Sequence, residues 1–122
     1  MRELVSMIRP HLPLRIDRVD VTEDNLNISG DGWALNVTCP WRMMTDDGLW
    51  FSWSDVEAPN LFTSLIGREL QDVRLIDNGP DPAFKISGNA ELQVFGDTDY
   101  DPWVISAADT IVVGLVSPPG FQ

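Results

Sequence analysis

The sequence is short of cysteine, of histidine and of positive charge, and these shortages exclude several classes of protein. A single cysteine, Cys39, rules out an internal disulfide framework and a structural zinc site that uses several thiolates. Eight Lys and Arg against nineteen Asp and Glu give a net charge of -11, which argues against nucleic-acid and anionic-membrane partners. No apolar run approaches the roughly 18 residues of a membrane-spanning helix, and residues 1–13 lack the apolar core of a secretory signal. We therefore expect a cytoplasmic protein.

Groups that could carry catalysis are equally scarce. The one histidine, His11, lies in a proline-flanked connection without a neighbouring nucleophile or orienting acid. The glycine loops that cradle phosphates are absent, because Gly30-Asp31-Gly32 joins two expected strands and does not open a helix. We therefore expect a protein that is not an enzyme and that needs no cofactor.

The chain does contain an internal repeat. Hydrophobic residues make up 43% of its 122 residues, enough for one core, so we expect a single domain over residues 1–122. Residues 26–30 match residues 84–88 at an offset of 58, and Pro40-Trp41 matches Pro102-Trp103 at an offset of 62. Continued without a gap, the second offset pairs Leu49 with Ile111, Phe51 with Val113, and Trp53 with Leu115. The two copies span residues 14–54 and 70–116.

Apolar and polar residues alternate within each copy, which is typical of half-buried strands. The predicted strands are 14–21, 25–29, 33–38, 41–44 and 49–54 in the first copy and 70–76, 83–87, 91–95, 103–107 and 111–116 in the second. A short helix is predicted over residues 1–9, ended by Pro10, and another over residues 59–67. One copy is too small to bury a core alone. We therefore expect a mainly β fold, with duplicated five-stranded meanders forming one pseudo-two-fold β-sandwich or barrel.

Short motifs give the chain a resemblance to known proteins. They are Leu65-Ile66-Gly67 before the second copy, a glycine-centred hairpin that continues into Leu92 and Val94, and the repeated Trp41 and Trp103. In these the chain resembles small acidic bacterial domains of unknown function, some of which lie near polymorphic toxin genes and are similar to immunity proteins. The resemblance implies a protein that inhibits a toxin by binding it, and it supplies no catalytic residue.

The tryptophans are the first candidates for a binding site. Strand alternation places Leu49, Phe51 and Trp53 on one face of their strand and Trp50 on the other. Trp50 and Trp33 have no aromatic counterpart in the second copy, so we predict that both are surface aromatics that contact a partner. The alternative is that they cover the end or the second face of the β structure.

Acidic turns are the second candidates. Asp46 and Asp47 precede a glycine in a predicted hairpin turn, and Asp97, Asp99 and Asp101 form an alternating run. That run begins like a calcium loop, but Pro102 stands where the loop glycine belongs and Ala108 where the bidentate glutamate belongs, so no metal site is predicted. Carboxylates at these turns would complement a basic surface.

Together these features predict an acidic, non-enzymatic module that binds a basic protein, most concretely an immunity-like inhibitor of a basic toxin. The alternative is a small-molecule-binding β-barrel or sandwich whose cleft lies between the two copies. The sequence leaves the oligomeric state open.

Overall fold

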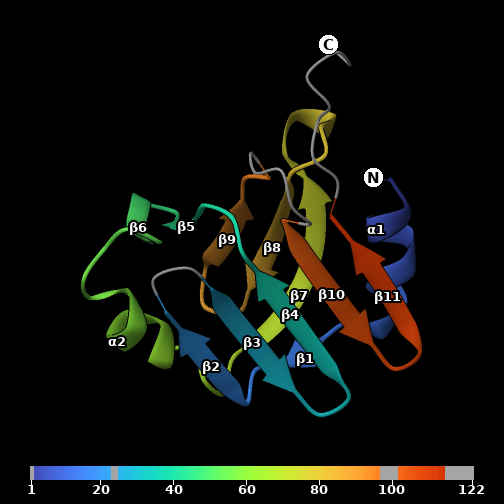
Figure 1. Cartoon of the computed structure of the whole chain (residues 1–122), viewed down its shortest axis with the longest axis horizontal. Helices are drawn as coiled ribbons and strands as arrows, with labels where there is room; N and C mark the ends of the chain where they lie inside the picture. Colours follow the sequence, from blue (N-terminus) through green and yellow to red (C-terminus); the bar gives the residue numbers. More distant parts are fainter. Residues whose placement is uncertain (1, 23–24, 97–101, 115–122) are drawn as a thin grey trace.

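The computed structural model describes residues 2–22, 25–96 and 102–114 (Figure 1). The α-helices are α1 (Arg2–Ile8) and α2 (Ala58–Thr63), and two single 3-10 turns cover Arg9–His11 and Ile76–Asn78. The strands of the first half are β1 (Leu14–Arg15), β2 (Arg18–Val21), β3 (Leu26–Gly30), β4 (Trp33–Val37), β5 (Trp41–Thr45) and β6 (Gly48–Ser52). Those of the second half are β7 (Glu69–Leu75), β8 (Pro82–Ile86), β9 (Ala90–Val94), β10 (Trp103–Ala107) and β11 (Thr110–Val113).

These strands form two antiparallel sheets that lie face to face (Figure 1). The first sheet has the order β1-β7-β8-β9-β5-β6 and the second has the order β11-β10-β4-β3-β2. Each ends in edge strands, so the predicted sandwich is present and the barrel is not. The predicted mainly β fold, with one N-terminal helix and one linking helix, is confirmed. Among the described residues no helix has the length and apolarity needed to cross a membrane.

Each half contributes strands to both sheets. The β5–β6 hairpin of the first half pairs with β9 of the second, and the β10–β11 hairpin of the second half pairs with β4 of the first. The registers of the two junctions correspond, because Trp41 lies opposite Val94 and Trp103 lies opposite Val37. Each hairpin thus completes the sheet of the other half. Because neither sheet is complete without a hairpin from the other half, the two halves share one core.

The two hairpins differ by one residue, which the alignment without a gap missed. In β5–β6, Met43 lies opposite Phe51 and Met44 opposite Leu49, so Trp50 is the extra residue of a β-bulge. The second hairpin has no such shift and places Ile105 opposite Val112. Phe51 therefore corresponds to Val112, both buried, and the predicted match of Phe51 with Val113 is wrong. The bulge also reverses the alternation, so Leu49 points outward and Phe51 inward.

The two helices close the open sides of the sandwich in equivalent places. Helix α1 packs against β7 and β11, and α2 packs against β2 and β6 (Figure 1). Both present apolar residues four apart to the core: Leu4 with Ile8, and Ala58 with Phe62. Phe62 meets Trp41 and Phe51 edge to face, with ring centroids 5.2 and 5.6 Å away. The helices therefore belong to the repeated unit, which the sequence prediction had limited to the strands.

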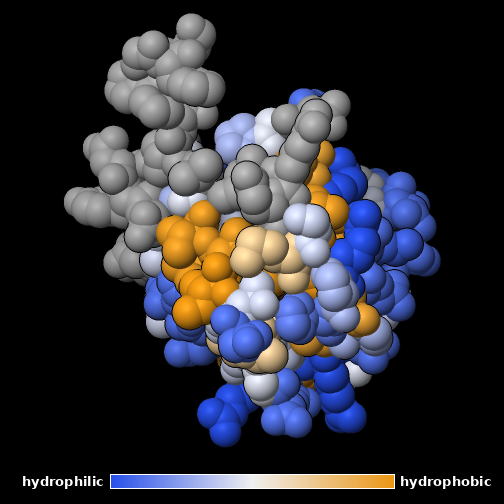
Figure 2. All heavy atoms as spheres, turned by 90° about the vertical axis from the view of Figure 1, so that its right-hand side faces the viewer, coloured by the Kyte–Doolittle hydropathy of each residue, from blue (hydrophilic) through white to orange (hydrophobic). Residues whose placement is uncertain are grey.

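Helix α1 and β11 also frame an exposed apolar surface, which faces the viewer in Figure 2. The large apolar residues exposed on these two elements are Met7, Ile111 and Val113. Strand β11 carries no charged residue.

We predict that deleting Trp50 leaves the protein folded, because the second half builds the same hairpin without the extra residue. The cost is the lost packing of a half-buried indole, less than about 3 kcal/mol. Far-UV circular dichroism and urea unfolding would measure it. Deleting Val104 from β10 is the control: that strand pairs on both sides, so a one-residue slip turns Ile105 outward and unfolds the protein. Loss of cooperative unfolding without Trp50 would contradict the equivalence of the hairpins.

Candidate functional site

One edge of the molecule is acidic and partly apolar. It consists of residues 46–57, which run from the β5–β6 turn along the edge strand β6 to the start of α2, and we call it the acidic edge (Figure 1). Its four carboxylates, all on exposed residues, are those of Asp46, Asp47, Asp55 and Glu57. The segment contains no lysine or arginine, so its negative charge is not neutralised from within.

Three large apolar side chains of the acidic edge are exposed. Leu49 is 63% exposed, Trp53 48% and Val56 92%. Exposed aromatic and aliphatic side chains surrounded by polar groups are typical of the energetic centre of a protein interface. The acidic edge therefore combines charge with apolar anchors on twelve consecutive residues.

The structure corrects the prediction for Trp33. This side chain is 4% exposed, and its indole Nε1 donates a hydrogen bond to the carbonyl oxygen of Arg15 at 2.8 Å. Gly30 makes room for the ring, because a Cβ at Gly30 would collide with both the indole and the Arg15 carbonyl. Trp33 fills the space over Gly30, whereas the Arg68 side chain lies over the equivalent Gly88. The Trp33 ring is therefore a buried part of the fold and is not open to a partner.

Trp50 is intermediate between the two predicted alternatives. The bulge leaves it half-buried, with its ring edge to face against Phe51 at a centroid distance of 5.0 Å. Part of the indole packs on the core and part remains accessible at the acidic edge. It can therefore contribute to a contact without being the main anchor.

Sequence reasoning missed Trp53 as a site residue. The backbone N–H of Trp53 donates to the carbonyl of Trp41, as the N–H of Gly114 donates to the carbonyl of Trp103. Trp53 therefore corresponds to Gly114, and the predicted match with Leu115, which lies outside the described residues, is off by the bulge. The second half closes the same backbone hydrogen bond with a glycine, over which the Trp103 indole packs so closely that a Cβ would collide with it. The hairpin therefore closes without an indole at this position. That asymmetry would have been visible in the sequence had the alignment allowed one gap.

Of the predicted acidic turn residues, the two that the structure describes are exposed to solvent in a turn. Asp46 and Asp47 are exposed in the β5–β6 turn, and Thr45 Oγ1 accepts a hydrogen bond from the Asp47 backbone N–H at 3.2 Å. Asp97, Asp99 and Asp101 lie outside the described residues, so their part in a site stays a prediction. Asp55 was not predicted, although it lies closest in sequence to Trp53 and Val56.

Trp53 separates two shallow cavities. The larger, about 380 Å³, lies between Trp53, Val21 and the residues from Ser54 to the start of α2. The smaller, about 150 Å³, lies towards the β4–β5 connection and is bounded by Val37, Pro40 and Trp41. Both share Trp53 and Thr22 as walls, so they adjoin each other on the two sides of this indole.

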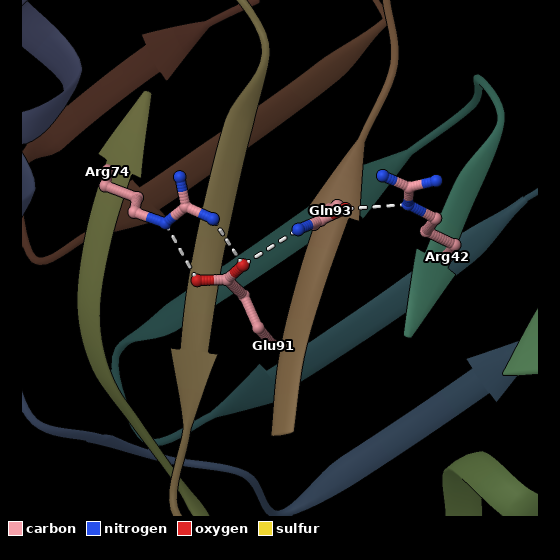
Figure 3. Close-up of polar contacts among 4 residues, drawn as sticks. All are labelled: Arg42, Arg74, Glu91 and Gln93. Carbon is pink, nitrogen blue, oxygen red and sulfur yellow. Dashed lines mark hydrogen bonds and ion pairs between the residues drawn. The ribbon is translucent and has the colours of Figure 1, made fainter. Parts of the chain in front are cut away.

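Two arginines, Arg42 and Arg74, take part in a polar network on the outer face of the first sheet (Figure 3). Arg74 makes two hydrogen bonds to the Glu91 carboxylate, at 2.7 and 3.0 Å. Gln93 donates to Glu91 at 2.9 Å and accepts from Arg42 Nε at 2.6 Å. The guanidinium of Arg42 also lies 5.0 Å from the Phe95 ring centroid. With Lys85 exposed beside this chain of bonds, three of the eight basic residues lie on this face. Arg42 lies opposite Ser52 of the acidic edge, and Lys85 lines a shallow pocket together with Asp46.

Hydrogen bonding in this network shifts two pKa values. The Arg74 guanidinium lowers the pKa of Glu91, partial burial opposes the shift, and the Gln93 amide adds to it. Glu91 in turn raises the pKa of Arg74. These polar groups satisfy one another across four strands, so we interpret the network as a structural feature of the sheet and not as the binding site.

No family model, no curated protein and no solved structure matches the chain. The resemblance to small acidic bacterial domains therefore stays a prediction. The case for a function depends on the geometry of the acidic edge.

We predict that Glu91→Gln lowers the free energy of unfolding at pH 7 by up to about 1 kcal/mol, because the bidentate pair with Arg74 is only partly shielded from water. A lowered folded-state pKa stabilises the fold above the ordinary glutamate pKa, and this contribution is lost as the pH falls through the lowered value. Urea unfolding at several pH values would show the two proteins converging in acid. Asp72→Asn is the control, since its pair with Arg9 is half-exposed on both sides. If the difference in free energy of unfolding between wild type and Glu91→Gln is the same at low pH as at pH 7, the stabilisation does not come from the ionised Glu91.

We predict a graded loss of stability for three alanine substitutions. Trp33→Ala costs about 3–5 kcal/mol, because it removes a buried indole and leaves the Arg15 carbonyl without its partner. Trp53→Ala costs less than about 1 kcal/mol, because half of the ring already lies in water. The cost of Trp50→Ala lies between these two values. Chemical unfolding measures all three, and a cost for Trp53 comparable to that for Trp33 would mean that Trp53 is a core residue.

Proposed function

We propose that this protein binds a basic protein through the acidic edge and is not an enzyme. The observation that carries the proposal is the difference between the two halves at equivalent positions. The first half adds Trp50 by a bulge and has Trp53 where the second half has Gly114. Both additions lie on the acidic edge, a segment with four carboxylates and no basic residue of its own. Residues that the fold does without, placed together on one exposed edge, support a role in binding.

Charge supports a basic partner and not merely any protein. The net charge of -11 attracts a positively charged surface from a distance and accelerates association, and the effect weakens as salt rises. Exposed Leu49, Trp53 and Val56 then supply the apolar contact that electrostatic attraction alone lacks. An immunity-like inhibitor that covers the active site of a basic toxin is the most concrete form of this proposal. A single buried cysteine fits action in the reducing cytoplasm.

The test is affinity capture from a lysate of cells that natively make the protein, with wild type and two matched variants. Leu49→Ser and Ile111→Ser change equivalent residues of the two hairpins, which are 63% and 64% exposed. We expect one basic protein to be retained at low salt and released at high salt. Leu49→Ser and Trp53→Ala should reduce its retention at least tenfold, and Ile111→Ser should leave it unchanged.

Three results would contradict the proposal. Equal loss for Leu49→Ser and Ile111→Ser would mean that binding does not use the acidic edge. Retention that is insensitive to salt would exclude the electrostatic contribution. Failure to retain any basic protein would leave the alternative, a small-molecule-binding sandwich, to be examined by ligand-induced thermal stabilisation.

A further inference from the structure

We propose that the larger cavity beside Trp53 binds the side chain of an arginine carried by the basic partner, an inference that rests on the proposed function. The cavity measures about 380 Å³, which exceeds the space one long side chain fills and leaves room for part of its backbone. It opens at the acidic edge between Trp53 and the residues that lead into α2.

The walls of this cavity suit a side chain with an apolar stem. Trp53, Val56 and Pro59 line it, with Val21 at the end of β2 opposite them. Trp53 and Val56 are among the most exposed large apolar residues of the described chain, so a stem laid between them buries surface that otherwise faces water. Arginine and lysine both bury their methylene groups in this way.

Among the described residues that line the cavity, Asp55 is the charged one. Its Oδ2 accepts a hydrogen bond from the Ser52 backbone N–H at 2.7 Å, and its own N–H donates to the Ser52 carbonyl at 3.1 Å. These two bonds hold the carboxylate in place. Among the described residues Asp55 has no ion pair, so its charge is available to a ligand.

The same geometry favours arginine over lysine. A guanidinium is planar and stacks on an indole, and it donates in a fork that matches a carboxylate, whereas an ammonium is a strongly hydrated point charge. Trp53 offers the aromatic face and Asp55 the carboxylate from positions two residues apart on one loop. One guanidinium can therefore meet both.

The smaller cavity gives a second position, and the described residues that line it are uncharged. It lies on the other side of Trp53, is about 150 Å³, and is bounded mainly by uncharged residues such as Val37 and Pro40. In an extended segment, side chains two residues apart point the same way and lie about 7 Å from each other. We therefore infer a partner segment with an aliphatic residue two positions from the arginine.

The test is a titration of the full chain with the peptide acetyl-Leu-Ser-Arg-amide, followed by the tryptophan indole resonances in NMR. We expect the Trp53 indole signal to move and to saturate, while the signal of buried Trp33 stays in place. Replacing the arginine by norleucine should weaken binding at least fivefold, and replacing it by lysine should weaken it at least twofold.

Asp55→Asn is the matched variant, because asparagine keeps an oxygen that can accept the Ser52 N–H. We expect this change to remove the preference for arginine over norleucine and to leave affinity for the norleucine peptide unaltered. If Trp53 does not respond, or if Asp55→Asn retains the arginine preference, the inference is wrong.

The two proposals can fail separately. A basic partner that depends on Trp53 but is neither displaced by the arginine peptide nor weakened by Asp55→Asn overturns the arginine pocket and leaves the proposed function standing. A peptide that binds as expected, with no salt-sensitive partner retained in the capture experiment, overturns the proposed function and leaves the pocket.

Discussion

The exchange of hairpins between the two sheets is the constraint on which the rest of the structure depends. The β5–β6 hairpin completes a sheet that the second half begins, and β10–β11 completes a sheet that the first half begins. Trp41 and Trp103 are buried at the two junctions, at equivalent registers. Because the apolar face of each half is covered only when the other half is folded, the two copies share one core and gain stability together.

This constraint also explains which residues the fold requires. Positions buried in both halves, such as Phe51 and Val112, serve the common core. Exposed positions at which the two halves carry different residues are not needed for the core. The other half forms the equivalent part of the core without those side chains. The two halves therefore act as an internal comparison, and it is this comparison that separates Trp53 from the structural tryptophans.

Charge is distributed unevenly over the same framework. Arg42, Arg74 and Lys85 lie on the outer face of the first sheet. There Arg42 donates a hydrogen bond to Gln93, and Arg74 donates to Glu91. The acidic edge contributes four carboxylates and no cation of its own, while Arg42 lies opposite its Ser52 and Lys85 shares a pocket with its Asp46. Arg42 and Arg74 are thus hydrogen-bonded within their own sheet, whereas the segment 46–57 carries only negative charge.

Most strands and the two helices could be predicted from the sequence, because period-two alternation and matched turns are local properties of the chain. The predicted strand 14–21 is instead two strands, β1 and β2, which belong to different sheets. The site could be predicted only in its chemistry, as aromatic residues among carboxylates. Trp33 was misassigned because strand alternation alone does not show that its ring packs over Gly30 and against the Arg15 carbonyl. Trp53 was missed because one bulge residue reverses the inward and outward faces of a strand.

The sequence by itself therefore determined the acidity, the all-but-absent cysteine, the mainly β class and the repeat. Only the tertiary structure decided which hairpin completes which sheet, which tryptophans are buried, and which carboxylate lies in a cavity beside an indole. The physical reason is that alternation assigns a residue to one of two faces, whereas burial depends on what packs against that face. That packing is supplied here by the other half of the chain.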